Sequence, residues 1–198
     1  MADVHVALFT TGYPYVDAVI RAVEISRRHG ASFSRSIGEP FSLRRDTFAR
    51  WFLEHSGTHA LFLEDDVVPP EDVLERLLRI EAPVVSAVYP RWLDGRLTTN
   101  VQDMRDSGWS DRVPARPFPV RRCTLGCVLV RREVFERVAA PWFLAVMTGD
   151  RFIEDNEWFC DAVRRQRMPI VCDGDAICAA VRQGTDLLTL TRGSIRDE

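Results

Sequence analysis

Short apolar runs alternate with amphipathic stretches over the first part of the chain. Apolar runs of about four to eight residues closed by turn residues are typical of buried strands, and apolar residues at helical spacing are typical of helices packed on a sheet. The runs predict strands over residues 5–10, 32–37 and 83–89, and one that starts at residue 60. The amphipathic stretches predict helices over residues 17–29, 43–55 and 71–80. The side chains expected to point inward from the first helix are Val19, Ile20, Val23 and Ile25. This alternation predicts a parallel sheet with helices on both faces, right-handed crossovers and ligand loops at one edge.

The pattern changes after residue 89. Residues 90–119 are rich in Arg, Asp, Gly, Pro and Trp, and they predict loops with one hairpin. Long irregular segments of compact domains are usually functional or mobile. Regular structure is then expected as strands over residues 120–123, 127–130 and 169–172 and helices over residues 132–138 and 155–167. The tail from residue 185 is polar at its end, and we expect it to be loosely held.

Composition narrows the class of protein. A length of 198 residues with 46% hydrophobic and 28% charged residues is ordinary for a single globular domain. No apolar run is long enough to span a bilayer and no signal-peptide pattern opens the chain, so we expect a cytoplasmic protein without stable membrane insertion. The five cysteines form no CxxC pair, which predicts reduced, mostly buried thiols and no zinc site.

Charge excludes some chemistry. The basic residues are all arginine, so Schiff-base and lysine-nucleophile reactions are excluded. A net charge of −3 gives no overall signature of nucleic-acid binding, although local arginine clusters could still face an anion.

The most informative segment is an apolar strand that ends in Glu64, Asp65 and Asp66. Pro69 and Pro70 then form the turn into the next helix, so the carboxylates lie at the C-terminal end of the strand, where open α/β sheets bind ligands. Adjacent buried carboxylates repel one another, and a divalent cation with a preference for oxygen ligands would neutralise them. Capping of the following helix is the alternative, but it explains residues after the prolines better than those before them.

A second acidic cluster contains Glu154 and Asp155 and directly precedes a helix. Carboxylates at a helix N-terminus are stabilised by the helix dipole, so capping is one interpretation. A partly shielded carboxylate opposite a cation is also what a general base requires. Both interpretations stay open on local grounds.

Taken in order, these segments resemble the GT-A nucleotide-sugar glycosyltransferases in a small, single-domain form. Glu64-Asp65-Asp66 looks like a variant of the DxD element, and the segment around Gly126 is similar to the strand and helix that line the sugar pocket. Glu154-Asp155 resembles the "ED" motif, and Arg45 lies in a segment similar to the Arg-bearing helix start that approaches the donor nucleotide. The chain departs from many relatives in having no metal-binding His after residues 169–172, where Arg182 could serve as a phosphate clamp instead.

The resemblance implies a GT-A (Rossmann-like) α/β fold with a mostly parallel sheet flanked by helices. It divides the single domain into a nucleotide-binding half, residues 1–89, and an acceptor-binding half, residues 90–198. The implied reaction moves a sugar from a nucleoside-diphosphate donor, foremost a UDP-sugar, to a hydroxyl acceptor, with inversion and with Mn²⁺ or Mg²⁺.

The roles implied for individual residues follow the motifs. Asp66 and Glu64 would hold the metal, and Asp155 would be the base, with Glu154 its alternate. The acceptor would meet Trp92 and Trp109 in the irregular segment, although these could equally pin a loop to the core. The residues expected to bind the donor are Thr10, Thr11, Gly12, Arg45, Asp65 and Gly126.

Several alternatives remain at this stage. The acceptor could be a saccharide or a hydroxymethylated base of phage DNA, which would place the protein in the host cytoplasm. A nucleotidyltransferase would use similar carboxylates, but it normally has a glycine-rich, basic loop after the first strand, which residues 11–15 do not supply. A degenerate protein that only binds nucleotide sugars is the third alternative.

Overall fold

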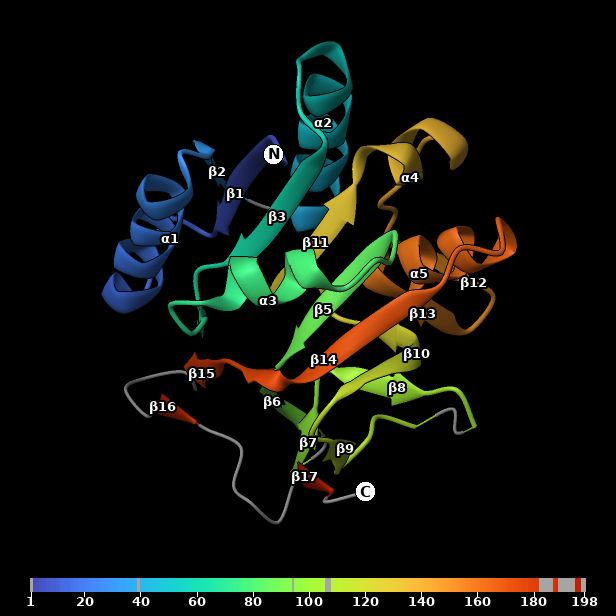
Figure 1. The fold of residues 1–198 in the computed structure, drawn as a ribbon. Helices are drawn as coiled ribbons and strands as arrows, with labels where there is room; N and C mark the ends of the chain where they lie inside the picture. Colours follow the sequence, from blue (N-terminus) through green and yellow to red (C-terminus); the bar gives the residue numbers. More distant parts are fainter. Residues whose placement is uncertain are drawn as a thin grey trace.

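The centre of the fold is an eight-stranded sheet (Figure 1). The computed structural model describes residues 2–38, 40–93, 95–105 and 108–181, together with the backbone of 187–188 and 195–196. The strands lie in the order β2 (Ser32–Ile37), β1 (Val4–Thr10), β3 (His59–Glu64), β11 (Cys127–Arg131), β5 (Val84–Val88), β14 (Ile170–Ile177), β10 (Pro117–Cys123) and β8 (Val101–Asp103). Strands β2, β1, β3, β5 and β14 run in one direction, while β11 and β10 run against their neighbours. The predicted α/β class with a mostly parallel sheet is confirmed.

Helices cover both faces of the sheet (Figure 1). Helices α1 (Val16–His29) and α3 (Val73–Arg79) pack on one face, and α2 (Phe41–Glu54), α4 (Arg132–Arg137) and α5 (Asp155–Arg165) pack on the other. Side chains of the buried strands alternate between the two cores, because successive residues of a strand point to opposite faces. The first core lies between the sheet and helices α1 and α3, and the second lies between the sheet and helices α2, α4 and α5. In β1, Leu8 points into the first core and Phe9 into the second.

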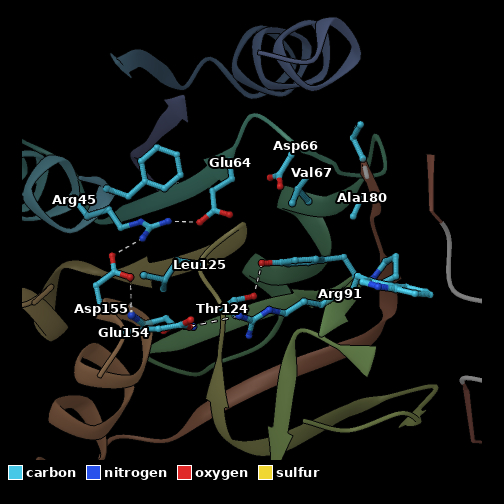
Figure 2. Close-up of a pocket in the computed structure, with 16 residues that line it drawn as sticks. Arg45, Glu64, Asp66, Val67, Arg91, Thr124, Leu125, Glu154, Asp155 and Ala180 are labelled. Atoms are coloured by element: carbon cyan, nitrogen blue, oxygen red, sulfur yellow. Dashed lines mark hydrogen bonds and ion pairs between the residues drawn. The ribbon is translucent and has the colours of Figure 1, made fainter. Parts of the chain in front are cut away.

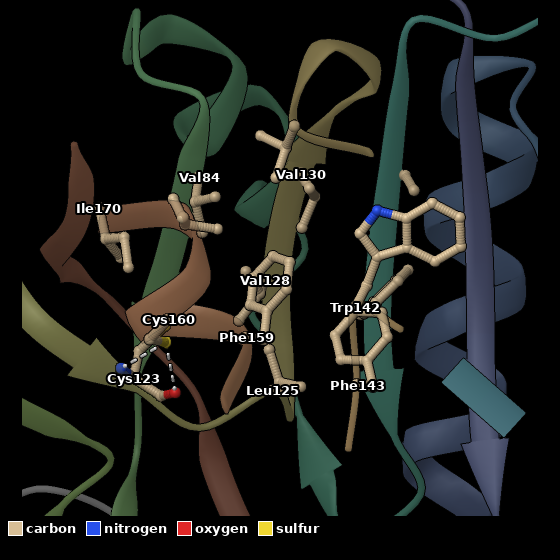
Figure 3. Close-up of a cluster of buried hydrophobic side chains, with 14 of the residues drawn as sticks. Val84, Cys123, Leu125, Val128, Val130, Trp142, Phe143, Phe159, Cys160 and Ile170 are labelled. Carbon is tan, nitrogen blue, oxygen red and sulfur yellow. Dashed lines mark hydrogen bonds between the residues drawn. The ribbon is translucent and has the colours of Figure 1, made fainter. Parts of the chain in front are cut away.

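The second core is rich in aromatic side chains. The Phe62 ring of β3 lies 5.3 Å from the Phe9 ring and 5.4 Å from the Phe48 ring of α2. The Phe159 ring of α5 stacks on the Phe143 ring with centroids 4.8 Å apart, next to Trp142 (Figure 3). These contacts fix α2 and α5 against the strands, and both helices carry residues of the site described below.

The buried face of α1 differs from the predicted one. Its buried residues are Ala18, Ala22, Ile25 and Ser26, whereas Ile20 is 50% exposed. Residues Val19 and Val23 are only partly buried. The prediction for Ile20 was wrong because small residues let the helix approach the sheet closely, and Ile20 lies two positions from Ala18, on the opposite side of the helix.

Residues 90–119 are more regular than predicted. The expected hairpin is present as β6 (Pro90–Leu93) and β7 (Arg96–Thr99). Strand β8 and the start of β10 extend the main sheet. The prediction of loops outside the hairpin was therefore wrong for β8 and the start of β10, because short strands with polar residues and prolines lack the apolar alternation that reveals longer strands.

The remaining short strands form small accessory pairings. They are β4 (Val67–Val68) with β15 (Ala179–Val181) and β16 (Leu187–Leu188), β12 (Val146–Thr148) with β13 (Arg151–Ile153), and β9 (Val113–Pro114) with β17 (Ile195–Arg196). The tail predicted to be loose lies outside the described residues, except for the backbone of 187–188 and 195–196. Within the described part, no helix is long and apolar enough to cross a membrane.

All five cysteines are unpaired and buried, as predicted. Cys123, Cys160 and Cys172 lie in one core, and Cys127 and Cys178 lie in the other. Burial raises the pKa of the Cys172 and Cys178 thiols. Burial thus keeps the Cys172 and Cys178 thiols protonated and shields all five cysteines from reagents.

Arg132 ties the end of α2 to the start of α4. Its Nη1 donates to the carbonyls of Phe52 and His55 at 3.2 and 2.8 Å, and its Nη2 donates to the Leu53 carbonyl at 2.7 Å. The last carbonyls of a helix have no partner within the helix, so a cation placed there satisfies them and also opposes the negative end of the helix dipole.

We predict that Arg132→Ala lowers the free energy of unfolding by about 1.5–3 kcal/mol, because the C-terminal carbonyls of α2 lose a charged donor. Urea denaturation measures this loss. A lysine at this position should recover only part of it, because one ammonium group cannot reproduce the planar fork. Arg137→Ala, on the same helix, is the matched control, since Arg137 donates a single bond to the Gln166 carbonyl at 3.2 Å. Equal losses in the two alanine variants would contradict the assignment.

Candidate active site

A cavity of about 610 Å³ opens at the C-terminal ends of β3 and β5, next to the N-terminus of α5 (Figure 2). Its size is in the range of small-molecule sites. Both predicted halves of the chain contribute to its wall. The charged residues that line it are Arg45, Glu64, Asp66, Arg91, Glu154 and Asp155.

Arg45 joins the two acidic clusters. This residue of α2 is only 3% exposed, its Nη2 donates to Glu64 Oε1, and its Nη1 donates to Asp155 Oδ2 at 2.5 Å. Figure 2 shows the guanidinium between the carboxylates. Burial disfavours the Arg45 cation, but Glu64 and Asp155 outweigh that effect, and the pKa of Arg45 is raised. The structure thus brings together a predicted metal ligand, a predicted donor contact and the predicted base.

The strand-end carboxylates are costly to ionise. Burial, together with the neighbouring charges of Asp66 and Asp155, raises the pKa of Glu64 to about 7 against the attraction of Arg45. Burial and the charge of Asp65 also raise the pKa of Asp66. Among the described residues, no arginine forms an ion pair with Asp66. Asp66, which is exposed, therefore lines the cavity without an ion pair to an arginine of the described residues.

These residues can be compared with what a divalent cation requires. No group of three or more His, Cys, Asp or Glu residues within the described ranges could hold a metal ion by itself. Magnesium, however, is often bound by one or two carboxylates together with water and substrate phosphates. Asp66 fits that mode, whereas Glu64 has Oε1 engaged by Arg45.

The contacts of Glu154 and Asp155 show how far these residues act as caps of α5. Glu154 occupies the N-cap position of α5 without a side-chain capping bond. Asp155 Oδ1 accepts from the Asn156 backbone N–H at 3.0 Å, while Oδ2 accepts from Arg45. Asp155 is thus oriented by a long-range contact as well as by its own helix.

Tyr89 forms part of the cavity wall. Its buried hydroxyl accepts from the Gly126 backbone N–H at 2.9 Å and lies 2.5 Å from Thr124 Oγ1. Burial raises the pKa of Tyr89 well above its usual value, so the phenol stays protonated. Gly126 is buried and is not part of the cavity lining, whereas its neighbours Thr124 and Leu125 are.

Other residues expected to bind the donor lie at the C-terminal ends of β1 and β3, at the same edge of the sheet as the cavity. They are not part of its lining. Thr10 is buried, and its Oγ1 accepts from the Gly12 backbone N–H at 3.0 Å. Thr11 and Gly12 are exposed. Asp65 is 8% exposed, and its backbone N–H donates to the Phe9 carbonyl at 3.1 Å. Their predicted role in donor binding stays a prediction.

Of the two residues expected to meet the acceptor, Trp92 belongs to the lining of the cavity and Trp109 does not. Trp92 lines the cavity and is 46% exposed. The Trp109 ring centre lies 4.5 Å from the Arg91 guanidinium carbon. Arg91 also pairs with Glu154 at 3.5 Å. Arg182, the predicted phosphate clamp, lies outside the described residues.

Sequence reasoning missed several residues of the wall. Tyr89 is the last residue of the predicted strand of residues 83–89 and Arg91 lies two residues after it, so their place at a strand end was a usable signal. Thr124, Leu125 and Asn156 each lie within two residues of a motif position, and only the folded chain shows which of these neighbours faces the cavity.

Comparisons with known proteins concern the fold. No protein-family model and no curated protein matches the sequence. Among solved structures, the chain is similar to A197 from STIV, with a TM-score of 0.71, 17% identity, and coverage of 94% of this chain and 90% of that chain. It is also similar to the inositol-1-phosphate CTP transferase from T. maritima, with a TM-score of 0.50, 9% identity, and coverage of 89% and 88%.

A further similar structure is a UDP-glucose pyrophosphorylase complexed with UDP-glucose, with a TM-score of 0.51, 12% identity, and coverage of 88% of this chain and 90% of that chain. At these identities the likeness establishes a shared α/β architecture over most of each chain. Function must be argued from the site.

We predict that Gly126→Ala lowers the free energy of unfolding by roughly 1–3 kcal/mol, because it overpacks a buried position. A Cβ at residue 126 would meet the Tyr89 hydroxyl at 2.5 Å and Val67 Cγ2 at 2.8 Å. In the double variant Gly126→Ala/Tyr89→Phe, the loss should be smaller than the sum of the single losses, since the clashing hydroxyl is gone. Urea denaturation of the four proteins tests this coupling, and strictly additive losses would contradict it.

Proposed function

We propose that the protein is a GT-A glycosyltransferase that moves a sugar from a nucleoside-diphosphate sugar, foremost a UDP-sugar, to a hydroxyl acceptor with inversion. The observation that carries the proposal is the placement of Asp66 and Asp155 on one cavity. Asp66 lies in the turn after the buried strand β3, and Asp155 starts helix α5. A single-displacement transfer requires such a pair of groups, one for a cation and one as a base.

The charge of the cavity supports a requirement for a metal. Four carboxylates and two arginines line it among the described residues, and both arginines pair with carboxylates. An anionic diphosphate would be repelled by this wall without additional positive charge. We assign Asp66 as the protein ligand of Mn²⁺ or Mg²⁺, with Glu64 adjacent. The bound cation would stabilise the negative charge of the leaving diphosphate.

The proposed transfer is a single displacement at the anomeric carbon of the donor sugar. The acceptor oxygen forms a bond to the anomeric carbon of the donor as the bond from that carbon to the diphosphate oxygen breaks. The acceptor proton passes to the Asp155 carboxylate, which ends the step protonated. Glu154, paired with Arg91, is the alternate base. Trp92, which lines the cavity and is partly exposed, offers an aromatic face to an acceptor sugar.

A nucleotidyltransferase is the second candidate. It is favoured by the names of two fold relatives, a CTP transferase and a UDP-glucose pyrophosphorylase. Residues 11–15 weigh against it, because this loop after β1 has no basic side chain to hold a triphosphate. The paired state of Arg45 and Arg91 also leaves little positive charge for three phosphates.

One experiment separates these candidates. The protein is incubated with a panel of nucleotide sugars, Mn²⁺ or Mg²⁺, and either saccharide acceptors or DNA containing hydroxymethylated bases, and release of nucleoside diphosphate is measured. A parallel panel of nucleoside triphosphates and sugar 1-phosphates is read by pyrophosphate release. Pyrophosphate without nucleoside diphosphate would replace the proposal by its rival. Donor binding without either product would favour a degenerate binding protein.

We predict that Asp66→Asn weakens Mn²⁺-dependent donor binding at least about tenfold, because the change removes the charge and keeps the shape. Calorimetry with the donor, with Mn²⁺ and then with EDTA, measures the effect. Asp175→Asn, an exposed change on β14, should bind the donor like the parent. Unchanged Mn²⁺-dependent affinity in folded Asp66→Asn would remove Asp66 as the metal ligand.

We predict that Asp155→Asn slows sugar transfer by about 10²–10⁴-fold while donor affinity stays nearly unchanged, because an aligned base contributes on that scale. A role limited to stabilising the first turn of α5 through the helix dipole predicts a different result, a small loss of stability with transfer unchanged. The control on the same helix is Asp161→Asn, whose carboxylate pairs with Arg122 instead of facing the cavity. Transfer within a few-fold of the parent would shift the role of base to Glu154.

A further inference from the structure

Arg45 connects three elements that are far apart in the sequence. It belongs to α2, Glu64 ends β3, and Asp155 begins α5. Its two terminal nitrogens donate to different carboxylates, Nη2 to Glu64 and Nη1 to Asp155. A guanidinium can make two such directed bonds at once because its donors form a rigid, planar fork.

The guanidinium is also confined by aromatic rings. Its central carbon lies 5.7 Å from the centre of the Phe9 ring and 5.2 Å from the centre of the Phe41 ring. Phe9 belongs to the buried strand β1, and its ring packs on Phe48 and Phe62 in the core. Because the fork is held by the core, its direction is set before any ligand binds.

This confinement determines the orientation of Asp155. One carboxylate oxygen is fixed by Arg45 Nη1 at 2.5 Å and the other by the Asn156 backbone N–H at 3.0 Å. The plane of the carboxylate is therefore defined, and with it the direction from which either oxygen can take a proton.

We propose that Arg45 is a positioning residue for the base: it acts on the transfer step through Asp155, with Glu64 as the anchor for its other nitrogen. The inference rests on the proposed function and differs from the expectation that Arg45 contacts the donor nucleotide. In this proposal Glu64 holds Arg45 through its Oε1 atom. That oxygen is then not available as a metal ligand.

The test compares Arg45 variants in two backgrounds. In the parent background, Arg45→Met and Arg45→Lys should lower kcat by about 10–10²-fold with the donor KM changed less than about threefold, because orientation of the base is lost and donor contacts are kept. In the Asp155→Asn background, the same variants should lower the residual kcat less than about threefold, because the group that Arg45 positions is already disabled.

Two controls keep the result interpretable. Arg45→Lys retains the charge that the buried carboxylates need, so it carries the test if Arg45→Met does not fold. Arg50→Met changes an exposed arginine of α2 that lies after Arg45 and pairs with Asp46, and it should leave both constants unchanged. Thermal melting of every variant checks the fold.

The outcomes are distinguishable. A parent protein that transfers no sugar from any donor would overturn the proposed function itself. A parent that transfers sugar, with Arg45 variants that raise the donor KM at constant kcat, would overturn only the positioning role and restore Arg45 as a donor contact. Equal losses of kcat in both backgrounds would also overturn it, because Arg45 would then act independently of Asp155.

Discussion

Burial of carboxylates at the end of an apolar strand is the constraint on which this site depends. A buried anion without a partner is strongly destabilising. The chain meets this cost at Glu64 with one arginine from a neighbouring helix, and the same arginine also reaches Asp155. The position of α2 against the sheet, the direction of α5 and the shape of the cavity are thereby linked through one side chain.

The two cores of the sheet make this linkage possible. Phe48, Phe52, Phe62 and Phe159 hold α2 and α5 on the same face of the sheet. The functional groups are then carried by ends of elements whose middles are rigid, which is how a small domain keeps a polar site in register. Because residues from both sides of position 89 line the cavity, the proposed nucleotide and acceptor halves share one site and are not separate modules.

Much of this organisation follows from the sequence, because it depends on local patterns. The elements before residue 89 repeat apolar spacings that buried strands and helices impose, and their ends differ from the predicted ones by only one or two residues. The acidic end of β3 was predictable for the same reason, because its carboxylates directly follow an apolar run. The strands within residues 90–119 were missed because their pairing with other parts of the sheet, and not their own pattern, defines them.

The site was predictable as a set of residues but not as a set of contacts. The motifs named Arg45, Glu64 and Asp155 separately, with a different role for each. Nothing in the local sequence around residue 45 indicates that its side chain bridges residues 64 and 155, since this depends on three elements packing together. Gly126 illustrates the same limit: the motif pointed to the glycine, while the fold exposes Thr124 and Leu125 to the cavity.

The positions of the cysteines can report the order in which parts of the fold unfold locally. All five lie after residue 122, on β10, β11, β14, α5 and the residue after β14, and they divide between the two faces of the sheet. A thiol reagent can reach each one only when its own layer separates from the strands. The order in which they are alkylated would therefore show which helical layer detaches first, in the unaltered protein and without any introduced probe.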